Sequence, residues 1–374
     1  MPVSKKQSII GKIYNSTIFT INIVLIFLLV LSAYSDRISP ADWVVFSFLG
    51  IGFPFILILN LLFLLWWLIF FRWKQSIICL IGLLLCWNTI RAYIPLHSQT
   101  PDVPANCIKV LTYNVMGFNN TQPHRKNNPN PVLQFIIDSH ADIVCIQEHR
   151  SHAVDGLLSA EQLKKALAMY PYSHLSPPGK RSYKDGTYGL SIYSKFPILA
   201  TKKIPFYSEY NGAFLSTLDV HGKKLLLVNC HLETNRLSDE ERKQYSDFVK
   251  NPGSKKIDAV AGSAFKKLKP AFKIRASQAE KVAEAMQQEQ SPYVVVCGDF
   301  NDTPISYALH KIQGNLNDAF VETGRGLGIT YNQNRFYFRI DHILHSKNIR
   351  AYNCSVGNLK ASDHYPVWAW LQLN

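Results

Sequence analysis

One short segment, Val296–Asn301, places a carboxylate and a carboxamide two residues apart directly after an apolar run. The run Tyr293–Val296 is typical of a buried strand, and Gly298 then turns the chain. On extended backbone, positions i and i+2 point to the same face. The spacing therefore predicts that Asp299 and Asn301 aim at one point beyond the end of a strand.

Further polar clusters follow the same design, each at the end of an apolar strand. Singly, each polar group could be a simple strand cap. Five such clusters in one chain instead indicate a site that combines a hard divalent cation with acid–base groups. Besides the first segment, they lie in Leu111–Asn114, Asp142–Glu148, Leu225–His231 and a C-terminal pair, Arg339–Leu344 and Ser362–Pro366.

The elements that must position these groups alternate between strands and helices. Helices are predicted at Pro131–His140 and Ser159–Met169, each before a strand, and at Ala276–Gln288 before the strand that ends at Asp299. About 270 residues follow the apolar N-terminal region, which is enough chain to bury one large core.

In this order, the motifs resemble those of the endonuclease/exonuclease/phosphatase superfamily, which includes the deoxyribonuclease I-like enzymes. The resemblance covers residues 106–374. It implies a four-layer α/β sandwich, in which two mixed β-sheets are flanked by helices and the site lies where the strand ends of both sheets converge. The motifs that carry it are Tyr113-Asn114, Gln147-Glu148, Asn229–His231, Gly298–Asn301 and Ser362–His364, together with Tyr188–Lys195, which looks like the family's central strand.

The resemblance also implies a metal site. Glu148 would be the principal Mg²⁺ ligand, helped by Asn114 and Asp363, with Mn²⁺ as a possible substitute. Some family members carry an acidic residue where this chain has Met116, so the metal shell is expected to be thinner here. Zinc is disfavoured because the chain has no Cys-x-x-Cys pair.

The remaining site residues take catalytic roles by the same resemblance. His364 would hydrogen-bond the scissile phosphate or act as an acid–base group, and Asp341 would orient it, since a carboxylate fixes the imidazole tautomer and favours the cation. Asp299 would orient or deprotonate the attacking water. Asn301 would hold a phosphoryl oxygen, and His231 would contact the phosphate from the opposite side.

The charge balance favours an anionic partner. The chain carries a net charge of +14, and much of the excess lies between Arg236 and Lys281. Such a basic cluster suits nucleic acid or acidic lipid headgroups, although a solvated loop and helix face would look the same. Arg275, with Gln278 one turn later, is the member we expect nearest to a substrate phosphate.

The first hundred residues contain three apolar runs, Ile18–Tyr34, Trp43–Phe71 and Ser76–Tyr93. Runs of roughly 20 apolar residues match the thickness of a bilayer, and a cleaved signal peptide is disfavoured because two further runs follow the first. We expect a membrane anchor of about three transmembrane helices over residues 1–94, a linker over 95–105 and a catalytic domain over 106–374.

The charges that flank these runs predict the orientation. Basic residues precede the first run and lie between the second and third, whereas the loop Ser35–Asp42 carries one Arg against two Asp. Positive-inside placement then predicts a multi-pass membrane protein whose catalytic domain is extracytoplasmic. If the third run does not span, the domain is instead cytoplasmic.

The sequence therefore predicts a Mg²⁺-dependent phosphoesterase that hydrolyses phosphodiester or phosphomonoester bonds by in-line attack of water. A membrane-tethered nuclease-like hydrolase is the first version, and a phospholipid, sphingomyelin or inositol-phosphate hydrolase is the second. A non-catalytic membrane-bound binding module that keeps the fold is the alternative class. The expected partners are a phosphate-ester substrate and a lipid bilayer. The odd number of cysteines argues against full pairing, but leaves a Cys107–Cys354 disulfide open.

Overall fold

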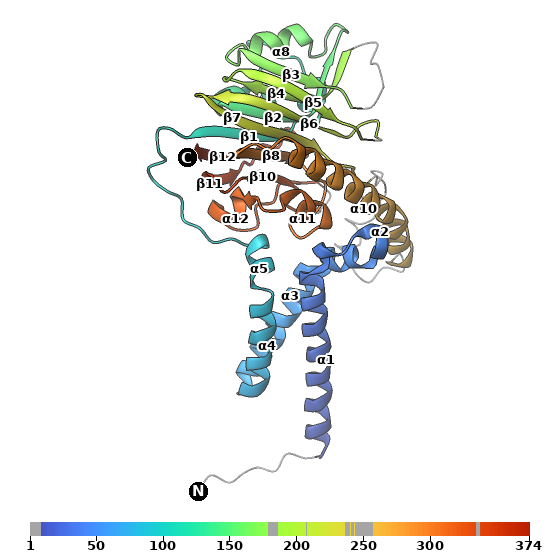
Figure 1. The fold of residues 1–374 in the computed structure, drawn as a ribbon. Helices are drawn as coiled ribbons and strands as arrows, with labels where there is room; N and C mark the ends of the chain where they lie inside the picture. The colour runs from blue at the N-terminus through green and yellow to red at the C-terminus, as the bar shows by residue number, and fades with distance from the viewer. Residues whose placement is uncertain are drawn as a thin grey trace. The chain divides into compact units, whose positions relative to one another are not determined.

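The computed structural model describes residues 9–178, 186–206, 208–235, 240, 243, 257–333 and 337–374. The chain forms two compact units. The helical unit comprises Met1–Arg91 with Ile305–Tyr307. The second unit, called the catalytic unit after the sequence prediction, comprises Ala92–Pro304 with Ala308–Asn374. Figure 1 labels many of the elements of each unit.

The helical unit contains two helices that are long and apolar enough to cross a membrane, over Tyr14–Ala33 and Val45–Ile69. The segments Trp73–Leu85 and Trp87–Tyr93 pass the same test only as a pair bent by 65°, so the described residues contain two or three candidate spans. The break falls inside the third apolar run. The helices are α1 (Ile9–Ala33), η1 (Ser35–Arg37), α2 (Pro40–Trp43), α3 (Val45–Ile69), α4 (Trp73–Leu85) and α5 (Trp87–Tyr93).

A buried asparagine joins three of these helices. Asn22 of α1 accepts hydrogen bonds through Oδ1 from Trp67 Nε1 of α3, at 2.9 Å, and from Cys79 Sγ of α4, at 3.0 Å. Asn60 of α3 donates to the Leu25 carbonyl of α1 at 3.1 Å. Neutral polar groups that bond across helices in this way stabilise helix packing where water is absent.

The catalytic unit contains two six-stranded sheets. Each sheet is mixed, with one parallel pair at its centre, β1–β2 in sheet I and β7–β8 in sheet II, and antiparallel pairs elsewhere. Sheet I has the order β11 (Ile349–Val356), β12 (Val367–Leu373), β1 (Ile108–Asn114), β2 (Ile143–His152), β4 (Gly186–Ser194), β3 (Tyr172–Ser176). Sheet II has the order β5 (Ile198–Ile204), β6 (Gly212–Val220), β7 (Lys223–His231), β8 (Tyr293–Asp299), β10 (Asp341–His345), β9 (Asn317–Asp318).

Three apolar clusters separate four layers. One cluster lies between the sheets, with Val110 of β1 facing Leu227 of β7 and Val295 of β8 across the core. The outer face of sheet I packs on α7 (Pro131–Asp138) and α8 (Ala160–Ala166), and that of sheet II packs on α10 (Ile257–Gln288) and α11 (Tyr307–Gln313). Figure 1 shows the two stacked sheets. The predicted four-layer sandwich is confirmed.

Local capping explains where the predicted helices begin. Asn130 caps α7 by accepting from the backbone N–H groups of Val132 and Leu133, and Ser159 forms a capping box with Gln162 at the start of α8. Both helices are shorter at their C-terminal ends than predicted, whereas α10 begins well before the expected Ala276.

Candidate active site

Side-chain alternation brings polar groups from both sheets to one place. In β8, the residues that face the other sheet are Val295, Cys297 and, at the strand end, Asp299. The inward positions of the neighbouring strands likewise change from apolar to polar at their ends. These inward polar residues are Thr112 and Asn114 of β1, Gln147 of β2, Asn229 and His231 of β7, and Asp341 of β10.

A fully buried hydrogen-bond network joins the sheets beneath this site. Gln147 donates through Nε2 to Asn229 Oδ1 at 2.7 Å and to Thr112 Oγ1 at 3.1 Å. Asn229 in turn donates to the carbonyls of Ile146, at 3.2 Å, and Ser191, at 3.0 Å. The motif residues Gln147 and Asn229, which received no role from the sequence, thus fix the spacing of sheet I against sheet II.

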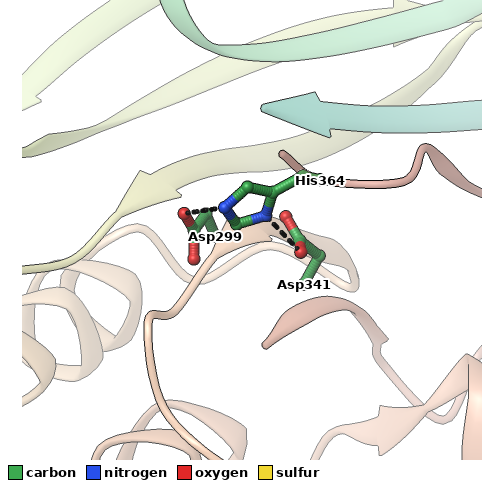
Figure 2. Close-up of side chains that lie close together, drawn as sticks. All are labelled: Asp299, Asp341 and His364. Atoms are coloured by element: carbon green, nitrogen blue, oxygen red, sulfur yellow. Dashed lines mark hydrogen bonds and ion pairs between the residues drawn. The ribbon is translucent and has the colours of Figure 1, made fainter. Parts of the chain in front are cut away.

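The centre of the site is an imidazole between two carboxylates (Figure 2). His364 Nδ1 lies 2.8 Å from Asp341 Oδ2, and His364 Nε2 lies 3.5 Å from Asp299 Oδ2. All three side chains are buried. The three expected catalytic residues therefore lie together, although they are far apart in the sequence.

The charges of this cluster stabilise one another. Burial alone would lower the pKa of His364, but the carboxylates of Asp341 and Asp299 outweigh it and hold that pKa well above its usual value. Burial raises the pKa of Asp299 to about 6, against the opposing effect of His364. The two carboxylates therefore favour the cationic form of His364, whereas burial favours the neutral form of Asp299.

A second group of donors and acceptors approaches Asp299 from sheet I. Asn114 Nδ2 lies 3.1 Å from Asp299 Oδ2 and 3.2 Å from Glu148 Oε1. Strand alternation alone would not aim Glu148 at this point. Its backbone is left-handed, with φ of 54°, and the β2–β4 register shifts between Ile146 and His149. This β-bulge re-aims the half-buried Glu148 side chain towards the site.

His231 completes the site from sheet II. Its Nε2 lies 3.6 Å from Asp299 Oδ2 and 3.9 Å from Glu148 Oε1, and neither ring nitrogen has a hydrogen-bond partner among the described residues. Burial lowers the pKa of His231, with Asp299 acting in the opposite direction. A buried ring without partners has both nitrogens available for a ligand.

The loop after β8 departs from the predicted geometry. β8 ends at Asp299, and Asn301 is left-handed with φ of 52°, so the two side chains do not share one extended face. Instead, the Asn301 N–H donates to Asp299 Oδ1 at 2.8 Å, and Asn301 Nδ2 donates to the Leu232 carbonyl at 3.0 Å. Asn301 thus orients the Asp299 carboxylate and ties its loop to the loop that follows His231.

Two hydroxyl groups position the C-terminal part of the site. Ser362 Oγ donates to the Asn114 carbonyl at 2.7 Å and accepts from the His364 N–H at 3.2 Å. Thr330 Oγ1 accepts from the backbone N–H of Asp341 at 3.1 Å. Asp363, between Ser362 and His364, is half-buried. Ser362 belongs to a motif visible in the sequence, but nothing in the sequence pointed to Thr330.

Arg275 lies outside this cluster, with other partners than the expected phosphate. The guanidinium is buried, 1% exposed, and its Nε lies 3.0 Å from Asp302 Oδ2. Its Nη1 donates to the Glu233 carbonyl at 2.8 Å and to Asn235 Oδ1 at 2.9 Å. Arg275 therefore joins α10 to the loops that follow β7 and β8.

Other sequence expectations also have clear outcomes. Cys107 and Cys354 are both free, so the disulfide that the sequence left open is not formed in the structure. His342 pairs through Nδ1 with Asp318 Oδ2 at 3.0 Å. Much of the basic cluster that begins at Arg236 lies outside the described residues.

The donor set fits a hard divalent cation on the Glu148 side. The Glu148 and Asp299 carboxylates converge there, and such oxygen donors suit Mg²⁺ or Mn²⁺. The Asn114 amide nitrogen lies between them and donates to both, while its Oδ1 accepts from Met116 N. Among the described residues, ligand atoms of Asp299, Asp341 and His364 also lie within 4.8 Å of one another. In that second group, His364 Nδ1 lies 2.8 Å from Asp341 Oδ2.

Comparison with protein families agrees with this geometry. Residues 111–364, more than half of the chain, match the Endonuclease/Exonuclease/phosphatase family, so the chain belongs to that family. It is therefore a metal-dependent hydrolase of phosphate ester bonds. Residues 15–93 match a second family, described as a domain of unknown function (DUF8431). A comparison with curated protein sequences gives no match.

Solved structures match this chain at low sequence identity. The human Nocturnin catalytic domain with bound sulfate anion is 16% identical, with a TM-score of 0.51, and the match covers 75% of this chain and 99% of that one. An endonuclease/exonuclease/phosphatase from Beutenbergia cavernae is 18% identical, with a TM-score of 0.48 and 72% of each chain covered. Truncated Caenorhabditis elegans TDP2 is 17% identical, with a TM-score of 0.44, covering 72% of this chain and 100% of that one.

Proposed function

We propose that the protein is a Mg²⁺-dependent, membrane-tethered phosphoesterase of the nuclease type, which cleaves phosphodiester or phosphomonoester bonds by in-line attack of water. The observation that carries this proposal is the convergence of Glu148, Asn114, Asp299, His231 and the Asp341–His364 pair at one edge of two sheets. This set combines oxygen donors for a cation with groups that accept a proton and groups that stabilise phosphoryl charge.

In the proposed reaction, Asp299 orients the attacking water and takes its proton. Its raised pKa suits a base that must accept a proton near neutral pH. Asn301 holds the Asp299 carboxylate through its backbone N–H, so the carboxylate is positioned before substrate binds. Asn301 is also proposed to hold a phosphoryl oxygen.

The two histidines stabilise the negative charge that develops on the phosphoryl oxygens. Protonated His364, held in orientation by Asp341, donates from Nε2, and His231 contacts the phosphate from the opposite side. Glu148, Asn114 and Asp363 are proposed to hold the cation, which would supply Lewis-acid stabilisation of the phosphoryl group and orient the substrate.

Arg275 is no longer proposed as a substrate contact, because its guanidinium is occupied by Asp302, Glu233 and Asn235. The nuclease version therefore depends on the net positive charge of the chain rather than on one named phosphate ligand. The second version, a lipid or inositol-phosphate hydrolase, is favoured by the apolar helices in the same chain.

We further propose that the apolar region of residues 1–94 anchors the catalytic domain with three spans. Basic residues before the first span and between the second and third would then leave the catalytic domain outside the cytoplasm. A reporter fused after Asn374 that is active only outside the cytoplasm tests this orientation. An active cytoplasmic reporter at the same position would support two spans.

The activity test uses the full chain in detergent micelles, with Mg²⁺, Mn²⁺ or EDTA. The substrates are plasmid DNA, RNA, inositol phosphates, sphingomyelin and glycerophospholipids. Asp299→Asn removes the proposed base, and Asp138→Asn on the exposed end of α7 is the matched control. Metal-dependent cleavage of DNA or RNA, lost in Asp299→Asn alone, supports the nuclease version. Turnover confined to lipid or inositol phosphates supports the second version, and no turnover of any substrate contradicts the proposal.

A further inference from the structure

The last residues of the third apolar run and the segment that follows them are hydrogen-bonded to the rest of the catalytic unit. Residues 95–105 were expected to be a linker, yet backbone and side-chain hydrogen bonds hold the beginning of this stretch. Pro95 O accepts from Gly326 N at 2.8 Å, and His97 N donates to Gly324 O at 3.2 Å. His97 Nε2 also lies 3.0 Å from Val321 O. We call Ala92–His97 the juxtamembrane strap.

One end of the strap lies against a buried arginine. Arg339 is 2% exposed and donates through Nη2 to the carbonyl of Ala92. Its guanidinium carbon lies 4.5 Å from the centre of the Phe320 ring, and Nη1 lies 3.5 Å from Leu327 O. A buried guanidinium needs such acceptors, because an unpaired buried charge is strongly destabilising. The strap backbone therefore helps to keep Arg339 in place.

Arg339 is two residues before Asp341, the carboxylate that orients His364. The intervening Ile340 accepts through its carbonyl from Phe300 N at 2.8 Å and donates to Thr330 Oγ1 at 2.9 Å. A shift of Arg339 would therefore move the start of β10 and, through Phe300, the loop that follows Asp299.

We propose that the juxtamembrane strap is a positioning element of the active site, acting through Arg339 on Asp341. The proposal rests on the function proposed above, since it assigns a role in that same site. It means that the catalytic domain begins at Ala92, and that undocking of the strap slows the reaction without removing any residue that touches substrate.

The experiment compares variants of the full chain in detergent micelles. Arg339→Met removes the guanidinium, and His97→Ala removes the side-chain contact of the strap with the Val321 carbonyl. Arg325→Met is the matched control, because Arg325, like Arg339, lies between the helix Ala319–Thr323 and β10, but is exposed. For each variant, kcat and KM are measured on the best substrate of the panel, together with hydrogen exchange over residues 337–345 and 225–231.

We expect Arg339→Met and His97→Ala to lower kcat about 10-fold to 100-fold with KM within about twofold, the size of effect that small displacements of catalytic groups produce. Hydrogen exchange should rise over 337–345 and stay unchanged over 225–231, while Arg325→Met resembles the unmodified chain. Unchanged kcat and exchange in both variants, or an equal rise of exchange in both segments, would overturn the proposal. If no chain hydrolyses any phosphate ester, the proposed function fails, and the exchange pattern alone still decides whether the strap positions β10.

Discussion

Both units of the molecule bury polar side chains, but the two sets differ in kind. The helical unit buries neutral groups, as in the contacts of Asn22 with Trp67 and Cys79, where hydrogen bonds join neighbouring helices. The catalytic unit buries ionisable groups close together, as in the cluster of Asp299, Asp341 and His364.

This difference has an energetic meaning. A neutral hydrogen bond between helices costs little to bury and specifies packing. Two carboxylates beside two imidazoles cost much more to desolvate, and His231 retains two ring nitrogens without a partner among the described residues. A buried cluster of ionisable side chains is typical of an active site, whereas buried amides between helices are typical of helix packing. Variants in each region test this distinction.

The largest effect is expected from Asp299→Asn. The substitution keeps the shape of the side chain but removes the group that accepts the proton, so kcat should fall about 10³-fold, within the usual range for loss of a general base. The measurement is steady-state turnover of the best substrate at pH 7.5. Asp138→Asn should leave kcat unchanged, and a loss of less than about tenfold in Asp299→Asn would exclude the proposed role.

The next effect concerns stability. Arg275→Met leaves the Asp302 carboxylate buried, 8% exposed, without its guanidinium partner. Breaking a buried pair on one side costs about 3–5 kcal/mol, so the free energy of unfolding should fall by about that amount in denaturant titration. The double variant Arg275→Met/Asp302→Asn should recover part of the loss. A fall in substrate affinity without loss of stability would instead restore Arg275 as a phosphate contact.

A smaller effect is expected from pH. Burial raises the pKa of Asp299 to about 6, and only its ionised form can accept a proton. The fraction of active enzyme should therefore fall about tenfold per pH unit below that pKa, while a bound cation would move the inflection to lower pH. The measurement is kcat/KM between pH 4.5 and 8 at saturating Mg²⁺. A profile that is flat, or that rises towards acid pH, contradicts Asp299 as the base.

The sequence predicted the sheet-end residues well because strand alternation is a local property. Asp299 and His231 are the last residues of their strands and Asp341 is the first residue of β10, and the structure places the three together. Glu148 could be assigned to the site only from the family resemblance. A β-bulge turns its side chain towards the site, and no local sequence pattern predicts that bulge.

Contacts that depend on distant partners were less predictable. The basic character of Arg275 favoured a phosphate, but the sequence could not show that Asp302 would lie within 3.0 Å of it. The prolines of residues 95–105 favoured a linker, yet the Pro95 carbonyl is bound by Gly326 N. In both cases the partner is distant in the sequence, so the spacing of residues along the chain could not predict the contact.

The smallest effect is expected in the helical unit. Asn22→Leu removes the acceptor of the Trp67 and Cys79 hydrogen bonds, and Leu remains compatible with an apolar helix. Hydrogen bonds between apolar helices contribute about 0.6 kcal/mol on average, so unfolding of the helical unit should shift by only that order. Turnover should be unchanged, since the residue is neutral and its partners carry no chemistry. Thermal unfolding and kcat of the full chain in micelles check both parts. A large loss of kcat with intact helices would mean that buried amides in this region also serve the reaction, and the contrast between the two units would no longer hold.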